Sequence, residues 1–311
     1  MLFRVDFSIA TGRSIWTMAI GLLISTLSLN CSTSFAQEAA VVDASADKEK
    51  VESKEKAERQ AWTKYYTHHL KNYKFIEKED EKKTLKATPK AMLRWDNPVR
   101  VGRTHGELFV WTQKGRGVLV GNIFSYDIGD GLQRNVSHEF HSFHDQPIAC
   151  KYSNASDFES TDKFELDAGV EYHEIMGAAP PAKKRALRLA QMRLLAKQFK
   201  AESKNKDVTQ PLRMLTKPLF RFDTKDVDDD GAIFAYVTGT DPELLIAIIT
   251  RKVDGAPKWL FGAGRFSDLP LSLKHKNKVV WEFGDRRSYA GGYYAQHGIT
   301  QQPQMPNVQS E

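Results

Sequence analysis

Cysteine is scarce in this chain, with two among 311 residues. Cys31 lies in an N-terminal apolar region that reads as a signal peptide, so its removal would leave Cys150 alone. A single cysteine cannot form an internal disulfide, and the mature chain must therefore be held together by its core. The length is ample for one large domain or two small ones.

Long apolar runs are also missing. The apolar stretch at residues 15–29 is interrupted by Ser, Thr and Gly, which disfavours a membrane span. It follows Arg4 and Arg13 and precedes the small residues Ser34 and Ala36, which is the pattern of a signal peptide over residues 1–36. We predict cleavage near Ala36 and export to the periplasm or the extracellular space. The alternative is a retained N-terminal anchor, and no transmembrane segment is expected in the mature chain.

Several catalytic and nucleotide-binding motifs are absent from the sequence. There is no Walker loop, no Gly-x-Gly-x-x-Gly, no Cys-x-x-Cys, no Gly-x-Ser-x-Gly and no His-Glu-x-x-His. The formal net charge of +6 is mild and carries no specific nucleic-acid signal. It permits contact with an anionic cell-envelope surface.

Two segments of the chain resemble each other. GELFVWTQKGRGVLVGNIFS (106–125) aligns without a gap with GAIFAYVTGTDPELLIAIIT (231–250), and FHDQPIACKYSNASDFE (143–159) aligns with FSDLPLSLKHKNKVVWE (266–282). The matches include Gly, Asp and Pro at turn positions, which strand alternation does not require. An ancient duplication is one interpretation, and two independent meanders with similar alternation are the other.

A predicted helix precedes each block, over residues 57–73 and 183–202. The pattern predicts an α+β fold of two tandem related units, each a helix followed by an antiparallel β-meander, with a ligand site between them. LLIAII (244–249) suits a strand buried on both faces. The predicted organisation is a signal peptide (1–36), a flexible leader (37–54), a first unit (55–160), a connector (161–179), a second unit (180–287) and a disordered tail (288–311).

The segment HEFHSFH (138–144) holds three of the nine histidines. On a helix these imidazoles would share one stripe, as in helical zinc sites, whereas on a strand they would divide between two faces. The aligned segment FGAGRFS (261–267) reads as a strand, and this favours a strand here. Two interpretations remain open. One is a strand face of hydrogen-bonded polar side chains, and the other is a two-histidine site. The candidate residues for that site are His105, His138, Glu139, His141 and His144.

Three further features carry weaker candidates. Asp226, Asp228 and Asp230 fit the opening of a calcium loop, although the position of its bidentate glutamate holds Val237, and an acidic turn is the alternative. The helix at 183–202 presents a basic surface through Lys183, Lys184, Arg188 and Arg193, suited to an anionic envelope surface or to solvent. Cys150 aligns with an apolar strand position, which predicts a buried free thiol.

Five segments together resemble a family of uncharacterised exported proteins of planctomycete-type bacteria. They are LRWDNPVR (93–100), HGELFVW (105–111), HEFHSF (138–143), GTDPELL (239–245) and VVWEF (279–283). The resemblance covers most of the mature chain and implies export, but it implies no activity.

The sequence thus favours an exported, non-enzymatic binding or interaction module over an enzyme. The competing hypothesis is a metal-assisted hydrolase that uses His138, Glu139, His141 and His144, with His105 as a further ligand. No cofactor is predicted by the first hypothesis, and a divalent metal ion is required by the second. The ligand or partner is not indicated.

Overall fold

The computed structural model describes residues 34–97, 103–129, 133–153, 163–284 and 292–301. Residues up to Glu55 and residues from Lys56 onward form two units. The predicted signal peptide lies outside the described residues as far as position 33. Residues 37–54, predicted to be a flexible leader, are instead helical and lie within α1 (Ser34–Leu70). The Ala-, Glu- and Lys-rich sequence of this helix has high helix propensity. None of the described helices is long and apolar enough to cross a membrane.

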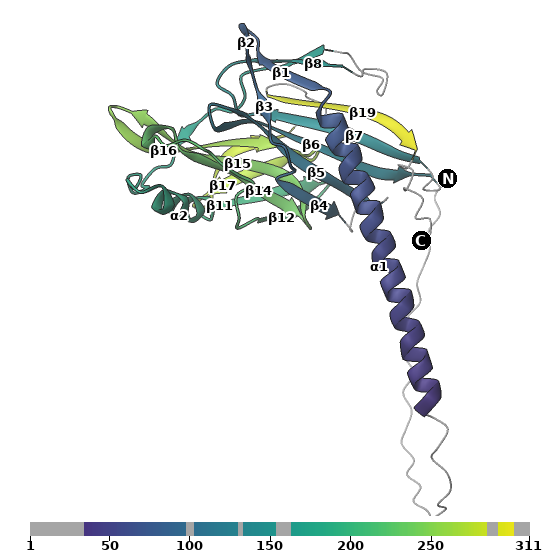
Figure 1. Ribbon diagram of the computed structural model, residues 1–311. Helices are drawn as coiled ribbons and strands as arrows, with labels where there is room; N and C mark the ends of the chain where they lie inside the picture. Colours follow the sequence, from purple (N-terminus) through teal and green to yellow (C-terminus); the bar gives the residue numbers. More distant parts are fainter. Residues whose placement is uncertain (1–33, 98–102, 130–132, 154–162, 285–291, 302–311) are drawn as a thin grey trace, which may run out of the picture. The chain divides into compact units, whose positions relative to one another are not determined.

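The unit from Lys56 onward is built mainly from three antiparallel sheets (Figure 1). The six-stranded sheet has the order β19-β7-β6-β5-β3, and β4 also pairs with β5. Its strands are β3 (Lys86–Ala87), β4 (Leu93–Asn97), β5 (Thr104–Gln113), β6 (Arg116–Ile128), β7 (Gln133–Ser142) and β19 (Tyr293–Gln301). The four-stranded sheet has the order β2-β1-β8-β9. Its strands are β1 (Tyr73–Glu77), β2 (Asp80–Thr84), β8 (Ile148–Tyr152) and β9 (Lys163–Leu166).

The nine-stranded sheet has the order β10-β16-β15-β14-β12-β11-β17-β18, and β13 also pairs with β14. Its strands are β10 (His173–Glu174), β11 (Phe199–Asn205), β12 (Val208–Met214), β13 (Phe220–Arg221), β14 (Gly231–Thr238), β15 (Asp241–Val253), β16 (Ala256–Arg265), β17 (Leu271–His275) and β18 (Lys278–Phe283). Besides α1, the described helices are α2 (Arg185–Ala196) and the short 3₁₀ helix η2 (Val227–Asp229).

Three apolar cores follow from the alternation of side chains along these strands. Leu119 and Ile123 of β6 face the core beneath the four-stranded sheet and α1, whereas Val120 and Phe124 face the core shared with the nine-stranded sheet. The third core lies between the nine-stranded sheet and α2, and includes Met192. The six-stranded sheet and the nine-stranded sheet therefore pack on each other through one face.

The central strands agree with the patterns in the sequence. Residues 241–250 of β15 are all buried, which confirms that LLIAII is covered on both faces. Lys114 and Gly115 form a two-residue turn between β5 and β6, with positive φ angles of 48° and 83°. Such a turn joins strands with the right-handed twist of a sheet, and glycine reaches this backbone region at little cost.

The predicted α+β fold of two helix-plus-meander units is wrong. The structure is mainly β, with large antiparallel sheets and few helices. The helix predicted over 183–202 ends at Ala196, and Phe199 begins β11 instead. The reason is tertiary pairing, because β11 bonds to both β12 and β17 and buries alternate side chains, which overrides the helical period of the local sequence.

Two segments predicted to be irregular contain strands. The connector at 161–179 includes β9 and β10. The tail predicted from Ser288 onward contains β19, which pairs with β7 along all nine of its residues. Tyr, Ile and Thr favour strands, and the open edge of β7 supplies hydrogen-bond partners that the local composition does not reveal.

Candidate functional site

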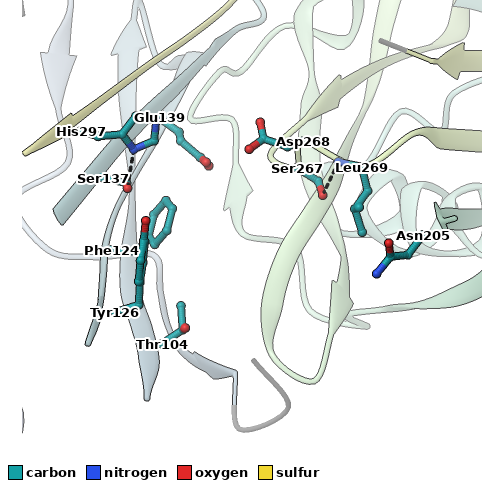
Figure 2. A pocket seen from close by; sticks show the side chains of 10 residues that line it. All are labelled: Thr104, Phe124, Tyr126, Ser137, Glu139, Asn205, Ser267, Asp268, Leu269 and His297. Atoms are coloured by element: carbon teal, nitrogen blue, oxygen red, sulfur yellow. Dashed lines mark hydrogen bonds between the residues drawn. The ribbon is translucent and has the colours of Figure 1, made fainter. Parts of the chain in front are cut away.

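A pocket of about 610 Å³ lies between the six-stranded sheet and residues from β11 and from the segment after β16 (Figure 2). One side is formed by Thr104, Phe124, Tyr126, Ser137, Glu139 and His297, and the other by Asn205, Ser267, Asp268 and Leu269. Figure 2 shows the carboxylates of Glu139 and Asp268 pointing toward each other from opposite sides. Among the described residues, the lining therefore includes two acids and several hydroxyl groups, and no Lys or Arg.

The geometry of β7 places the polar side chains on this side. Ser137 and Glu139 are two residues apart and so point to the same face of the strand. In the neighbouring strand β19, His297 lies directly opposite Ser137, and its Nδ1 is 2.7 Å from the Ser137 hydroxyl. The segment predicted to be a disordered tail thus supplies a lining residue of the pocket, His297.

Glu139 is held from behind by a chain of polar side chains. The Trp95 indole N–H donates to Asn122 Oδ1 at 2.9 Å, and the Asn122 amide donates to Glu139 Oε2 at 3.5 Å. Trp95 and Asn122 are buried, with 1% and 2% of their surface exposed. Because the indole fixes which end of the amide faces Glu139, the chain orients the carboxylate toward the pocket.

Two groups beside the carboxylates, His297 and Tyr293, are neutral near pH 7. Burial lowers the pKa of the His297 imidazole, and the charge of Asp268 offsets only part of this effect. Burial also raises the pKa of the Tyr293 hydroxyl well above its ordinary value, with the negative charge of Glu139 adding to the shift. Carboxylates only accept hydrogen bonds, so a ligand of this pocket must supply donors or positive charge.

His138 lies on the other face of β7, among the aromatic side chains beneath the four-stranded sheet. Its Nδ1 is 2.5 Å from the Tyr73 hydroxyl, which also accepts a hydrogen bond from Gln296. Its ring centroid is 5.3 Å from that of His69. Full burial, and then the nearby His69 and His297, hold its pKa well below the ordinary value, so the imidazole is neutral.

His141 shares its strand face with Glu139 and packs on the backbone of Gly264, where an added Cβ would lie 2.4 Å from the ring. Within the described residues neither ring nitrogen has a hydrogen-bond partner. Burial, followed by the charge of Arg265, lowers its pKa to about 3. Arg265 is buried between the rings of Phe283 and Tyr293, 3.8 Å and 3.9 Å from their centroids.

The two remaining candidates lie elsewhere. His144 follows the end of β7, with Nε2 3.2 Å from Gln113 Oε1 and 3.4 Å from Glu77 Oε1. His105 on β5 has its Nδ1 3.0 Å from the Tyr66 hydroxyl. The structure therefore brings His141 and Glu139 to one face but does not gather the histidines. In the part of the chain that the structure describes, no three His, Cys, Asp or Glu side chains are placed to hold a metal ion.

The acidic run forms a turn with a buried ion pair. Asp226 accepts a hydrogen bond from the Asp228 N–H at 2.9 Å and so caps η2. Asp230 is fully buried and its carboxylate accepts hydrogen bonds from Arg188, at 2.6 Å, and from Arg221. The third carboxylate of the predicted calcium loop is thus engaged by two guanidinium groups.

Only part of the basic surface predicted on the helix at 183–202 is exposed. Lys183, Lys184 and Arg193 are exposed, but Arg188 is 2% exposed and points inward to Asp230. The correction follows from helix geometry, because Arg188 shares its face with the buried Met192 and Leu195. Cys150 is a buried free cysteine, as predicted, and burial raises the pKa of its thiol.

Sequence reasoning named Glu139 but missed Ser137, Asp268 and His297. Asp268 is one of the aligned residues that the sequence places at turn positions, and His297 lies in the predicted tail. The only local signal was the alternation of Ser137 and Glu139 in a strand flanked by apolar residues. Their convergence depends on β19 and on the segment after β16, which lie more than 120 positions further along the chain.

No protein-family model matches the chain, and no curated protein matches its sequence. Among solved structures, the chain is similar to the GH36 alpha-galactosidase AgaA of Geobacillus stearothermophilus, with 6% identity and a TM-score of 0.22. A second similar structure is the alpha-galactosidase of Lactobacillus brevis, with 8% identity and a TM-score of 0.19. The matches cover 75% of this chain in both cases, but only 30% and 29% of the respective enzymes.

Proposed function

We propose that this chain is an exported, non-enzymatic binding protein that takes a small ligand rich in hydrogen-bond donors, such as an amine or a polyol. The observation that carries the proposal is the pocket of about 610 Å³ in which Glu139 and Asp268 face each other. Its volume is in the range typical of small-molecule sites. Acceptor-only carboxylates, hydroxyl groups and the apolar surfaces of Phe124 and Leu269 suit a compact polar ligand.

The geometry favours this function over a metal-assisted hydrolase. That alternative takes its metal ligands from His138, Glu139, His141 and His144, with His105 as a further ligand, and ligands must converge on one ion. His138 and His141 are on opposite faces of β7, and His144 lies beyond its end beside Glu77. The three imidazoles also have separate packing partners.

Ligand binding is tested by thermal melting across a panel of amines, sugars and divalent cations. We expect an amine or a polyol to raise the melting temperature by several degrees at about 100 times its Kd, since such binding adds about 2.7 kcal/mol of stability. Glu139→Gln and Asp268→Asn should each abolish the shift while the unliganded protein melts nearly as before. The exposed Glu81→Gln is the matched control and should retain it.

The outcomes separate the two functions. A ligand-induced rise in melting temperature that persists in both pocket variants would show that the ligand binds elsewhere. Stabilisation by zinc or manganese that is lost in His141→Ala and His144→Ala, with metal present in the purified protein, would instead show a metal site and favour the hydrolase hypothesis.

Export is supported by the basic start, the short apolar stretch and the small residues before Gln37. The resemblance to exported planctomycete-type proteins points the same way. We expect the protein recovered from the producing cell to begin at Gln37, and N-terminal sequencing of the mature chain checks this. An intact N-terminus in the membrane fraction would indicate the retained anchor instead.

A further inference from the structure

The outer face of α2 exposes two large leucines. Leu187 and Leu194 leave 54% and 63% of their surface exposed, whereas most large apolar side chains of the described residues are buried. The two leucines are seven positions apart and therefore lie on the same side of the helix, two turns from each other. Their side is turned away from the side of the buried residues Arg188, Met192 and Leu195.

Positive charge surrounds these leucines. Lys183 and Lys184 precede the helix, Arg193 lies in its last turn and Lys197 is its C-cap, and all four are exposed. The helix itself contains no acidic residue. We name Leu187, Leu194, Lys183, Lys184, Arg193 and Lys197 together the α2 face.

A groove of about 760 Å³ adjoins the α2 face, and Arg193 belongs to both. Its apolar lining includes Leu189, Leu215 and Pro218. Its charged lining residues are Arg193, Arg213, Lys217 and Arg221, and the lining within the described part of the chain contains no acidic residue. The pocket lined by Glu139 and Asp268 has the opposite character: its described lining residues include two acids and no Lys or Arg, and none of them lines the groove.

We propose that the α2 face docks onto an anionic phospholipid surface, with its leucines at the boundary of the headgroups and acyl chains. Lysine and arginine side chains are attracted to the negative potential of such a surface, and apolar side chains gain by leaving water there. A polyanion such as an acidic polysaccharide would use the same positive charge but would have no use for Leu187 and Leu194. The exposed leucines therefore favour lipid.

Sedimentation of the full mature chain with vesicles tests the proposal. We expect it to bind phosphatidylglycerol vesicles at low salt and to bind phosphatidylcholine vesicles far less. Lys184→Glu with Arg193→Glu should weaken the partition to phosphatidylglycerol by at least about tenfold, because each basic residue contributes roughly a factor of five. Leu187→Gln with Leu194→Gln should also weaken it by about tenfold.

The matched control is Lys74→Glu with Lys82→Glu, two exposed lysines of the four-stranded sheet. It changes the net charge by the same amount and should weaken partition by no more than about threefold. Equal losses in both charge-reversal variants would mean that net charge alone acts, and the proposal would fail. It would also fail if the leucine variant bound normally, or if the protein bound heparin but no vesicle. All the substituted side chains are exposed, so we expect unchanged melting temperatures. Measuring them excludes unfolding as the cause of weaker binding.

Discussion

Asp230→Asn should reduce the free energy of unfolding by about 3–5 kcal/mol, the usual cost of removing one partner from a buried ion pair. The substitution keeps the shape of the side chain but leaves the Arg188 guanidinium, which is 2% exposed, without its counter-charge. Burial opposes ionisation of Asp230, yet hydrogen bonds from Arg221 and Arg188 outweigh it and keep its pKa below the ordinary range. Denaturant unfolding at pH 7 measures the loss.

The neighbouring Asp226→Asn serves as the control. Asp226 is exposed and caps η2 with one hydrogen bond to the Asp228 N–H, so its loss should cost about 1 kcal/mol or less. The double variant Arg188→Met with Asp230→Asn should lose less unfolding free energy than the sum of the two single variants. In the double variant, neither position 188 nor position 230 holds a buried charge without its partner. If Asp230 served calcium instead, its substitution would matter only when calcium is present.

Acid should destabilise the protein between pH 6.5 and pH 5, before most carboxylates titrate. His141 has a pKa of about 3 in the folded state, and burial holds the pKa of His138 well below its ordinary value. Because an unfolded histidine titrates near 6.5, the unfolded state binds more protons in this range. Each buried neutral imidazole therefore makes its full contribution to the free energy of unfolding above pH 6.5. Below pH 6.5 this contribution falls by about 1.4 kcal/mol per pH unit.

The expected pH effect is specific to the buried residues. In His141→Gln, the difference in unfolding free energy between pH 7 and pH 5 should shrink by about 2 kcal/mol, because one titrating group is removed. The exposed His68→Gln should leave the difference unchanged. Urea unfolding at the two pH values makes the comparison, and an unaltered pH dependence in His141→Gln would show that this imidazole is accessible to protons in the folded state.

Local patterns in the sequence were sufficient for the central strands. The apolar run of LLIAII is a property of adjacent residues, and the structure confirms that it is a strand buried on both faces. The strand assignment of residues 138–142 is also confirmed, and it separated His138 from His141. The buried state of Cys150 followed from its apolar strand context.

The predicted fold class failed where the outcome depended on distant partners. Phe199 continues a helical apolar period, but pairing of β11 with β12 and β17 makes it the first residue of a strand. The residues of β19 have no apolar periodicity, and the open edge of β7 decides their conformation. Arg188 belongs to a basic run in the sequence, and only the packing of α2 turns it toward Asp230.

The sequence by itself determined short-range features of this protein, namely the doubly buried strand at 244–249 and the strand at 138–142. These depend on residues a few positions apart, whose backbone preferences act before any tertiary contact forms. The tertiary structure alone decided that Glu139, His297 and Asp268 line one pocket. Their positions are fixed by strand pairing and sheet packing between segments more than 120 residues apart, which no local pattern encodes.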